Sequence, residues 1–193
     1  KNCTKLKKVT INGDIAACDG HAVGGYSPDY SVFYNAGNKL NGLEVEFAGN
    51  ASKVPAYMFA TNGNKDNNVY CHISKLTIGK TVKTIDEYAL LNCYDLKEVV
   101  FAEGGVFESI GLDAFESCDG IETIKFPTTI KSIGQGAFFK CAGLKALTFT
   151  GDYVLETIDG WAFQDCTALE TVEIPKTVTA LGRGVFKNCT KIS

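Results

Sequence analysis

The sequence has few of the features that mark catalytic, membrane-spanning or nucleic-acid-binding proteins. Its 193 residues include only two histidines, one tryptophan, one methionine and four prolines. No apolar run approaches the roughly 18–20 residues that a membrane-spanning helix requires. The net charge is −3, and the largest basic cluster is the short KLKK at 5–8, whereas nucleic-acid-binding domains usually carry a basic stripe. We therefore expect neither a membrane span in this stretch of chain nor a nucleic-acid partner.

Motifs for common chemistries are also missing. The chain contains no G-x-S-x-G, no phosphate-binding loop and no H-E-x-x-H. Cys18-x-x-His21 and Cys71-His72 could in principle bind zinc, but neither pair has a second pair at a matching spacing. The segment 62–68 resembles a calcium loop faintly, without its glycine and final glutamate. We expect no catalytic residue, metal site or cofactor, and we interpret both histidines as loop residues of irregular insertions.

Long helical patterns are scarce as well. Twenty glycines indicate frequent turns, and amphipathic helical runs of ten or more residues are hard to find. Short β-type runs such as KLTI, EVVF, TIKF, ALTF and TVEI are common instead. The first ten residues, KNCTKLKKVT, include no apolar stretch, so we expect no intact signal peptide there.

What the chain does have is an internal repeat marked by cysteines at 93, 118, 141, 166 and 189, which are 25, 23, 25 and 23 residues apart. An apolar pair with strand-like alternation follows each of the first four cysteines, as Ile124 and Phe126 do in one unit. The unit is L-x-x-V-x-[IF]-(turn)-[VI]-x-x-I-[GD]-x-x-A-F-x-x-C. Residues three before the cysteines are apolar in every unit: Leu90, Phe115, Phe138, Phe163 and Phe186.

The alternation of unit lengths has a local cause. The two extra residues of the longer units lie in turn-rich segments at 102–105 and 150–152, so the apolar frame is undisturbed. A partial unit occurs at 1–11, and the frame degrades from about 12 to 72. We expect one domain over 1–193, with irregular units over 1–75 and regular 23/25-residue units over 76–193. Because the chain opens and closes within a unit, we expect a longer array or one without built-in caps.

This pattern resembles the leucine-rich repeat family, and most closely its bacterial BspA-like subclass, whose unit is about 23 residues long. The match is strong over 76–193, partial over 1–11 and loose over 12–72. The resemblance implies an α/β, mostly β, fold: a right-handed solenoid with a parallel sheet on the concave side and turns or short helical segments on the convex side. Proteins with such repeats occur on bacterial surfaces, where family members are associated with adhesion to host proteins or other cells.

The repeated residues have structural roles in such a stack. One strand per unit would pair with the next unit, and its apolar pair would point inward. The Ile-Gly step would be a strand end followed by a sharp turn, because glycine tolerates backbone geometry that costs other residues more. Ala-Phe would then begin a helical turn, with the phenylalanine filling the core.

The cysteines have two interpretations. Eight cysteines could form four disulfides. Equivalent cysteines in a stack would instead lie on adjacent units about 5 Å apart with parallel side chains, which suits a disulfide poorly. We favour a reduced, buried ladder, since free cysteine behaves as a small apolar residue. Its members are Cys93, Cys118, Cys141, Cys166 and Cys189.

Any ligand specificity must then lie in residues that do not repeat. The candidate surface comprises outward strand positions and two aromatic residues before the Ala-Phe or Ala-Leu step: Lys75, Thr77, Glu98, Val100, Thr123, Lys125, Thr148, Thr171, Glu173, Tyr88 and Trp161. Further variable positions are Gln135, Gly136, Phe139 and Lys140. Tyr26, Tyr30 and Tyr34 in the first insertion could anchor a ligand or cap the first units.

The sequence therefore predicts a non-catalytic binding module of a bacterial cell-surface or secreted protein. Its partner would be a protein or glycan of a host or neighbouring cell, recognised in adhesion. A structural spacer, or an accessory domain of a larger surface protein or enzyme, is the alternative. The step from fold to role is an analogy with the family.

Overall fold

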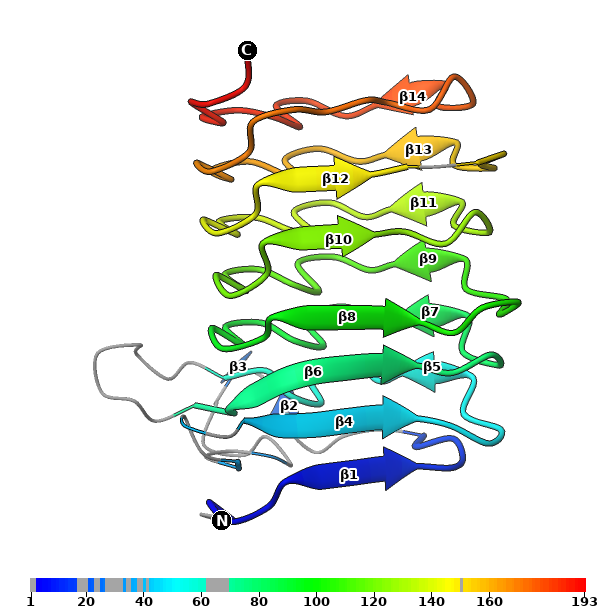
Figure 1. Ribbon diagram of the computed structural model, residues 1–193, viewed down its shortest axis with the longest axis vertical. Coiled ribbons are helices and arrows are strands. Elements are labelled where there is room, and N and C mark those ends of the chain that lie inside the picture. The colour runs from blue at the N-terminus through cyan, green and yellow to red at the C-terminus, as the bar shows by residue number, and fades with distance from the viewer. Residues whose placement is uncertain are drawn as a thin grey trace.

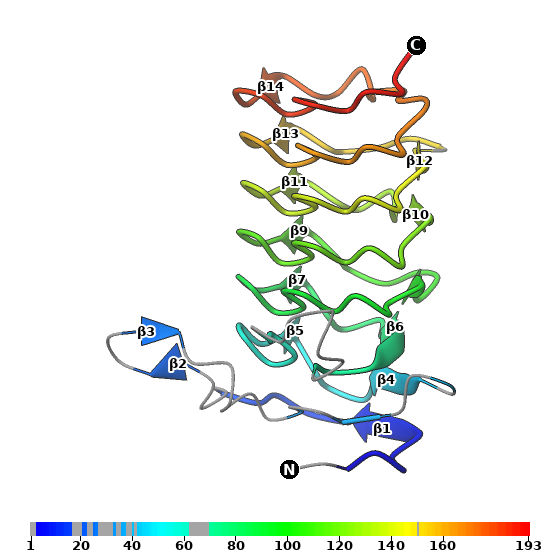
Figure 2. The same cartoon turned by 90° about the vertical axis from the view of Figure 1, so that its left-hand side faces the viewer.

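The computed structural model describes residues 3–16, 21–22, 25–26, 33, 36–37, 40, 42–61, 70–149 and 151–193. Units rise one above another in an almost straight stack, with the two ends of the chain at opposite ends (Figure 1). Two short strands, β2 (His21–Ala22) and β3 (Gly25–Tyr26), pair antiparallel beside the stack, as Figure 2 shows. The side chain of Tyr26, and Tyr30 and Tyr34, lie outside the described residues, as do Cys18, the side chain of His21 and 62–69.

One side of the stack is a parallel sheet. Strands β1 (Lys8–Ile11), β4 (Leu43–Phe47), β6 (Ile73–Ile78) and β8 (Glu98–Phe101) pair in that order. Strands β10 (Thr123–Lys125) and β12 (Ala146–Thr148) continue the series as a parallel pair, and a single bridge joins Ala146 to Thr171. Alternate residues point inward, so Ile124 is 1% exposed whereas its neighbours Thr123 and Lys125 face solvent. The predicted apolar pairs of the first three regular units thus pack on the inner side of this sheet, whereas Ile174 of the last pair is 37% exposed.

A second parallel sheet forms another side of the stack, and the chain reaches it after it leaves the first sheet. It consists of six two-residue strands in the order β14-β13-β11-β9-β7-β5. These strands are β5 (Lys53–Val54), β7 (Thr84–Ile85), β9 (Ser109–Ile110), β11 (Ser132–Ile133), β13 (Thr157–Ile158) and β14 (Ala180–Leu181). Glycine follows β9, β11 and β14, where the backbone of the previous unit lies close: a Cβ on Gly134 would be 2.8 Å from the carbonyl oxygen of Ile110. Aspartate stands at this position after β7 and β13. The sequence predicted one parallel sheet and a strand end at Ile-Gly; the strand end is confirmed at β9 and β11, and it belongs to a second sheet that was not expected.

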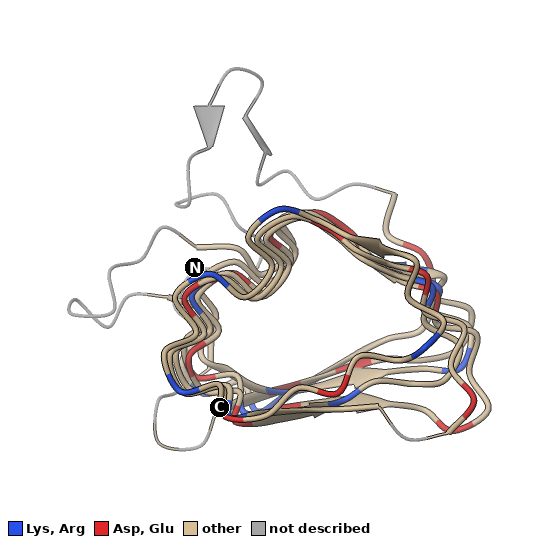
Figure 3. Cartoon of the chain, turned by 90° about the horizontal axis from the view of Figure 1, so that it is seen from above, with Lys and Arg blue, Asp and Glu red and all other residues tan. Residues whose placement is uncertain are grey.

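Turns occupy the third side, where the sequence predicted turns or short helical segments. The described ranges contain no helix, and so none that is long and apolar enough to cross a membrane. Backbone N–H groups here alternate between the next unit and their own: Phe138 N donates to Ala162 O of the next unit at 2.7 Å, whereas Phe139 N donates to Gly136 O of its own unit at 2.8 Å. Each regular unit also has residues with positive φ on either side of this pair, which is incompatible with a continuing helix. Viewed along the stack, the units superimpose in a three-sided outline (Figure 3).

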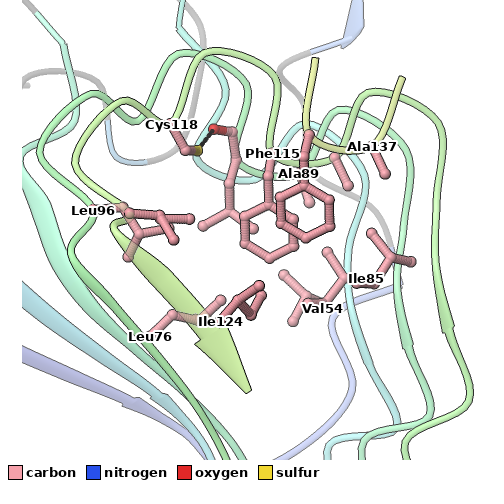
Figure 4. Packing of buried hydrophobic residues seen from close by; sticks show 14 of the residues in the cluster. Val54, Leu76, Ile85, Ala89, Leu96, Phe115, Cys118, Ile124 and Ala137 are labelled. Carbon is pink, nitrogen blue, oxygen red and sulfur yellow. Dashed lines mark hydrogen bonds between the residues drawn. The ribbon is translucent and has the colours of Figure 1, made fainter. Parts of the chain in front are cut away.

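The core runs unbroken between the three sides. The rings of Phe115, Phe138 and Phe163 stack nearly parallel, with centroids 5.0 and 5.3 Å apart, and all three are 0% exposed. Burying one such side chain contributes roughly 1.5–3 kcal/mol to stability. Figure 4 shows this packing, with Ala89 and Ala137 beside the rings and Ile124 and Leu76 opposite. The parallel mostly-β leucine-rich-repeat fold is therefore confirmed.

The ladder cysteines line one corner of that core as free thiols. Burial raises the pKa of Cys93, Cys118 and Cys141 above that of an ordinary thiol. Each thiol donates to a carbonyl of the preceding unit: Cys118 Sγ to Leu90 O at 3.3 Å (Figure 4) and Cys141 Sγ to Phe115 O at 3.0 Å. Cysteine therefore supplies a weak donor as well as a small apolar volume at this position.

Candidate functional site

The outward residues of the first sheet form a surface that we call the sheet face. The predicted strand residues all lie on it and are at least partly exposed: Lys75, Thr77, Glu98, Val100, Thr123, Lys125, Thr148, Thr171 and Glu173. The strand register places them in rows along the stack, so that Lys75 lies beside Glu98 and Thr77 beside Val100.

Some of the charges on the sheet face are paired between neighbouring units. The ion pairs are Lys8–Glu46 at 2.9 Å, Lys75–Glu98 at 3.0 Å and, at its border, Lys145–Glu122 at 2.8 Å. The hydrogen bond to Glu46 raises the pKa of Lys8, and that from Lys145 lowers the pKa of Glu122. Blue and red positions are interspersed around the outline in Figure 3. The sheet face consequently offers a mixed, nearly balanced surface, with uncharged Thr77 and Val100 between the pairs.

Hollows occur where long and short loops alternate at the end of the first sheet. One of about 490 Å³ lies between the long loop 102–105 and the short loop 127–129, with Lys125 at its border. Another of about 350 Å³ lies between 151–153 and 175–177, bordered by Glu173. The two extra residues of every second unit thus make this edge uneven, with a hollow beside each of the two longer loops.

The two predicted aromatic residues occupy the same turn position in different units but do not come together. Tyr88 has φ 54° and Trp161 has φ 60°, a left-handed conformation that is uncommon for bulky residues. Tyr88 stacks on Tyr57 of the previous unit, with centroids 5.0 Å apart. The guanidinium of Arg183, from the next unit, lies 5.1 Å from the ring of Trp161.

Trp161 instead borders a hollow of about 320 Å³ on the turn side, which we call the turn-side hollow. Its lining comes from three consecutive units: Asp113, Glu116, Gln135, Gly136, Phe139, Trp161 and Gln164. The sequence had singled out Gln135, Gly136, Phe139 and Trp161 as variable positions. It missed Asp113, Glu116 and Gln164, although they occupy the same repeat positions in the adjoining units.

Two carboxylates in the turn-side hollow are half-buried. Burial raises the pKa of Asp113. Burial also raises the pKa of Glu116, with a further contribution from Asp113 and a partial offset from Lys140. Over the residues that the structure describes, neither carboxylate forms a side-chain hydrogen bond or an ion pair. These acceptors are therefore available to a ligand.

His72 is not the loop residue that the sequence indicated. It is 3% exposed, and its Nδ1 lies 2.6 Å from Oδ2 of Asp95 in the next unit. The hydroxyl of Tyr70 donates to the other oxygen of Asp95 at 3.3 Å. A buried polar group is costly without a partner, and Asp95 supplies one to His72. This network therefore stabilises the fold. Within the described ranges, no group of three His, Cys, Asp or Glu side chains could hold a metal ion.

Comparison with solved structures places these features in context. The pneumococcal vaccine antigen PcpA matches with a TM-score of 0.63 and 28% identity, over 74% of this chain and 34% of that one. A leucine-rich cell surface protein from Faecalibacterium prausnitzii matches with a TM-score of 0.50 and 25% identity, over 74% and 42%. A Treponema pallidum leucine-rich repeat protein, at 20% identity and a TM-score of 0.54, covers 79% and 78% and shows the fold alone.

The chain thus spans about a third to two fifths of the first two structures it matches. No curated protein matches the sequence. The family described as BspA type leucine rich repeat region matches residues 66–193 in six copies. The cysteine-marked unit, the stacked parallel strands and this match agree, and the protein belongs to the BspA-type leucine-rich repeat family.

Proposed function

We propose that this chain is a non-catalytic binding module of a bacterial cell-surface or secreted protein, which recognises a protein or glycan of a host or neighbouring cell in adhesion. The observation that carries the proposal is the sheet face, on which variable side chains are held in fixed rows by a repeated core. The likeness of this chain to PcpA and to the Faecalibacterium surface protein supports a location at the cell surface. We also propose that 1–193 act as one domain, because β1 and β4 continue the sheet of β6 and β8.

The centre of the sheet face suits protein contact. Thr77 and Val100 are partly exposed neighbours in register, flanked on one side by the Lys75–Glu98 pair. An uncharged centre with charged groups at its margin is the arrangement that binding interfaces favour.

The test measures attachment of the purified chain to immobilised extracellular-matrix proteins and to host cells. Wild type should attach saturably, and a Thr77→Lys/Val100→Glu double variant should lose at least about tenfold in affinity, since it adds unpaired charges at the centre. The control is Thr179→Lys, an exposed substitution directly before β14 of the second sheet and away from the sheet face. Attachment that is absent in wild type, or equally strong in the double variant, would favour the spacer or accessory role.

A further inference from the structure

The turn-side hollow exists because one unit has glycine where its neighbours have side chains. Gly136 occupies the left-handed position, with φ 58°, that Tyr57, Tyr88, Asp113 and Trp161 fill in other units. A Cβ at Gly136 would collide with the Oδ1 atom of Asp113. The Asp113 carboxylate occupies part of the space that a side chain at 136 would fill, and the hollow is the space that remains between Asp113 and Trp161.

The polar groups around this gap are carboxylates and amides. Asp113 and Glu116 only accept hydrogen bonds when ionised, whereas Gln135 and Gln164 both donate and accept. Gln164 Nε2 also donates to Oδ2 of Asp165 at 3.1 Å, which restrains its side chain. The two carboxylates have no side-chain partner in the described part of the chain, so their lone pairs are open to donors from a ligand.

The apolar groups of the hollow are aromatic. Phe139 and Trp161 border it from adjacent units. A cation already lies over each ring: Lys140 Nζ is 4.7 Å from the Phe139 centroid, and Arg183 is 5.1 Å from that of Trp161. Lys140 also offsets part of the charge of Glu116, so a further cation gains less by entering. A neutral ligand with an apolar face and several hydroxyl groups matches both kinds of lining.

We propose that the turn-side hollow is a carbohydrate-binding subsite that takes one neutral pyranose ring, its hydroxyls donating to Asp113 and Glu116 and its C–H face lying against Trp161. The volume of about 320 Å³ is at the lower end of ligand pockets, which suits a single sugar unit. This deepens the proposed adhesive function and rests on it for its biological setting, but it uses a different side of the molecule from the sheet face.

The chain provides its own reporter, because Trp161 is its single tryptophan. The experiment titrates the intact chain with neutral methyl pyranosides of glucose, galactose, mannose and N-acetylglucosamine, and follows tryptophan emission. At least one sugar should give a saturable change at millimolar concentration. Choline and N-acetyl-lysine amide serve as cationic probes and should give none.

Two variants test the lining. Glu116→Gln replaces an acceptor-only group with an amide and should weaken sugar binding about tenfold, the usual effect of losing a hydrogen bond to a charged group. Gly136→Asn fills the hollow with a residue that tolerates positive φ and should abolish the response. Glu87→Gln, the same change at an exposed turn residue of another unit outside the hollow, is the matched control and should bind as wild type does. Circular dichroism and thermal melting establish that each variant is folded.

The outcomes separate the two proposals. No saturable change with any sugar, a response to the cationic probes instead, or an undiminished response in folded Gly136→Asn would each overturn the subsite. Cell attachment that survives in Gly136→Asn but fails in Thr77→Lys/Val100→Glu would leave the sheet-face function standing when the subsite fails. A sugar response without any cell attachment would leave the subsite standing and overturn the adhesive role.

Discussion

The sheet side and the turn side of the solenoid are built by the same stacking but treat charge in opposite ways. On the sheet face, Lys75 and Glu98 of neighbouring units pair at 3.0 Å, so the charges support the stack. On the turn side, Glu116 and Asp113 are half-buried without such a partner, and burial raises the pKa of both. Groups that are held at a cost to stability are frequent at functional sites. The difference is one of the observations that support the subsite proposed for the turn-side hollow.

The largest expected effect concerns the core that both sides share. Phe138→Ala should lower the free energy of unfolding by about 3–5 kcal/mol, because it leaves a gap in the stack of rings. Phe138 lies between Phe115 and Phe163 and also meets Phe126 edge-on at 5.9 Å. Urea unfolding followed by circular dichroism measures the loss.

Its counterpart on the sheet side is Ile124→Ala, which should cost about 2–5 kcal/mol because Ile124 lies on the inner face of β10. The ring stack predicts the greater loss for Phe138→Ala. A melt unchanged by Phe138→Ala would contradict the stacking at this position.

The cysteine ladder should give the next largest effect. Cys141→Ala should lower the free energy of unfolding by about 1–2 kcal/mol, through lost volume and a lost bond to Phe115 O. Cys141→Ser distinguishes the two causes. A serine hydroxyl can still donate to Phe115 O, but it is more costly to bury than a thiol if it has no acceptor. If the bond matters, Ser will be less destabilising than Ala; if only apolar volume matters, Ser will be the more destabilising.

A smaller loss is expected on the sheet face. Glu98→Gln should lower the free energy of unfolding by about 0.2–1 kcal/mol at low salt, since it removes the exposed pair with Lys75. The difference from wild type should shrink as salt is added, because salt screens exposed charges. A double-mutant cycle with Lys75→Gln measures the coupling, and a coupling of zero would show that the pair does not support the stack.

The same change of glutamate to glutamine on the turn side, Glu116→Gln, should raise the free energy of unfolding instead of lowering it. Burial raises the folded-state pKa of Glu116, so at pH 7 wild type carries the cost of a half-buried charge that Glu116→Gln removes. The variant should be more stable by no more than a few tenths of a kcal/mol, because solvent still screens the group. The advantage should fade as pH drops through the raised pKa and vanish below about 4.3, the unfolded value. A destabilised variant at pH 7 would show that Glu116 has a structural partner.

The regular units were predictable from sequence because their core positions recur at fixed spacing. Phe115, Phe138 and Phe163 identify one register, and that register places Ile124 inward and Lys125 outward. The second sheet was not predictable, since a strand such as Ser132–Ile133 is too short to show alternation. The helical turn at Ala-Phe was an expectation from local preference; single turns remain there, but hydrogen bonds to the next unit, such as Phe138 N to Ala162 O, alternate with them and no helix forms in the described ranges.

The conformation and burial of individual side chains outside the repeated positions were harder to predict from the sequence. A bulky residue such as Trp161 seldom adopts positive φ, so nothing local indicates that it will do so. His72 lies in a stretch where the repeat degrades, and its burial depends on Asp95 from the following unit. In each case the decisive contact comes from a neighbouring unit.

The sequence by itself determined the repeat, its register, the apolar core and the reduced cysteine ladder as the favoured arrangement, because each of these depends on which residue types recur and at what spacing. Only the tertiary structure decided which of the remaining side chains meet. Asp113, Gln135 and Trp161 lie in three different units and share one hollow because those units stack in register and glycine leaves a gap at 136. The paired charges of one side and the unpaired carboxylates of the other follow from the same cause, since stacking brings together residues that are a full unit apart along the chain.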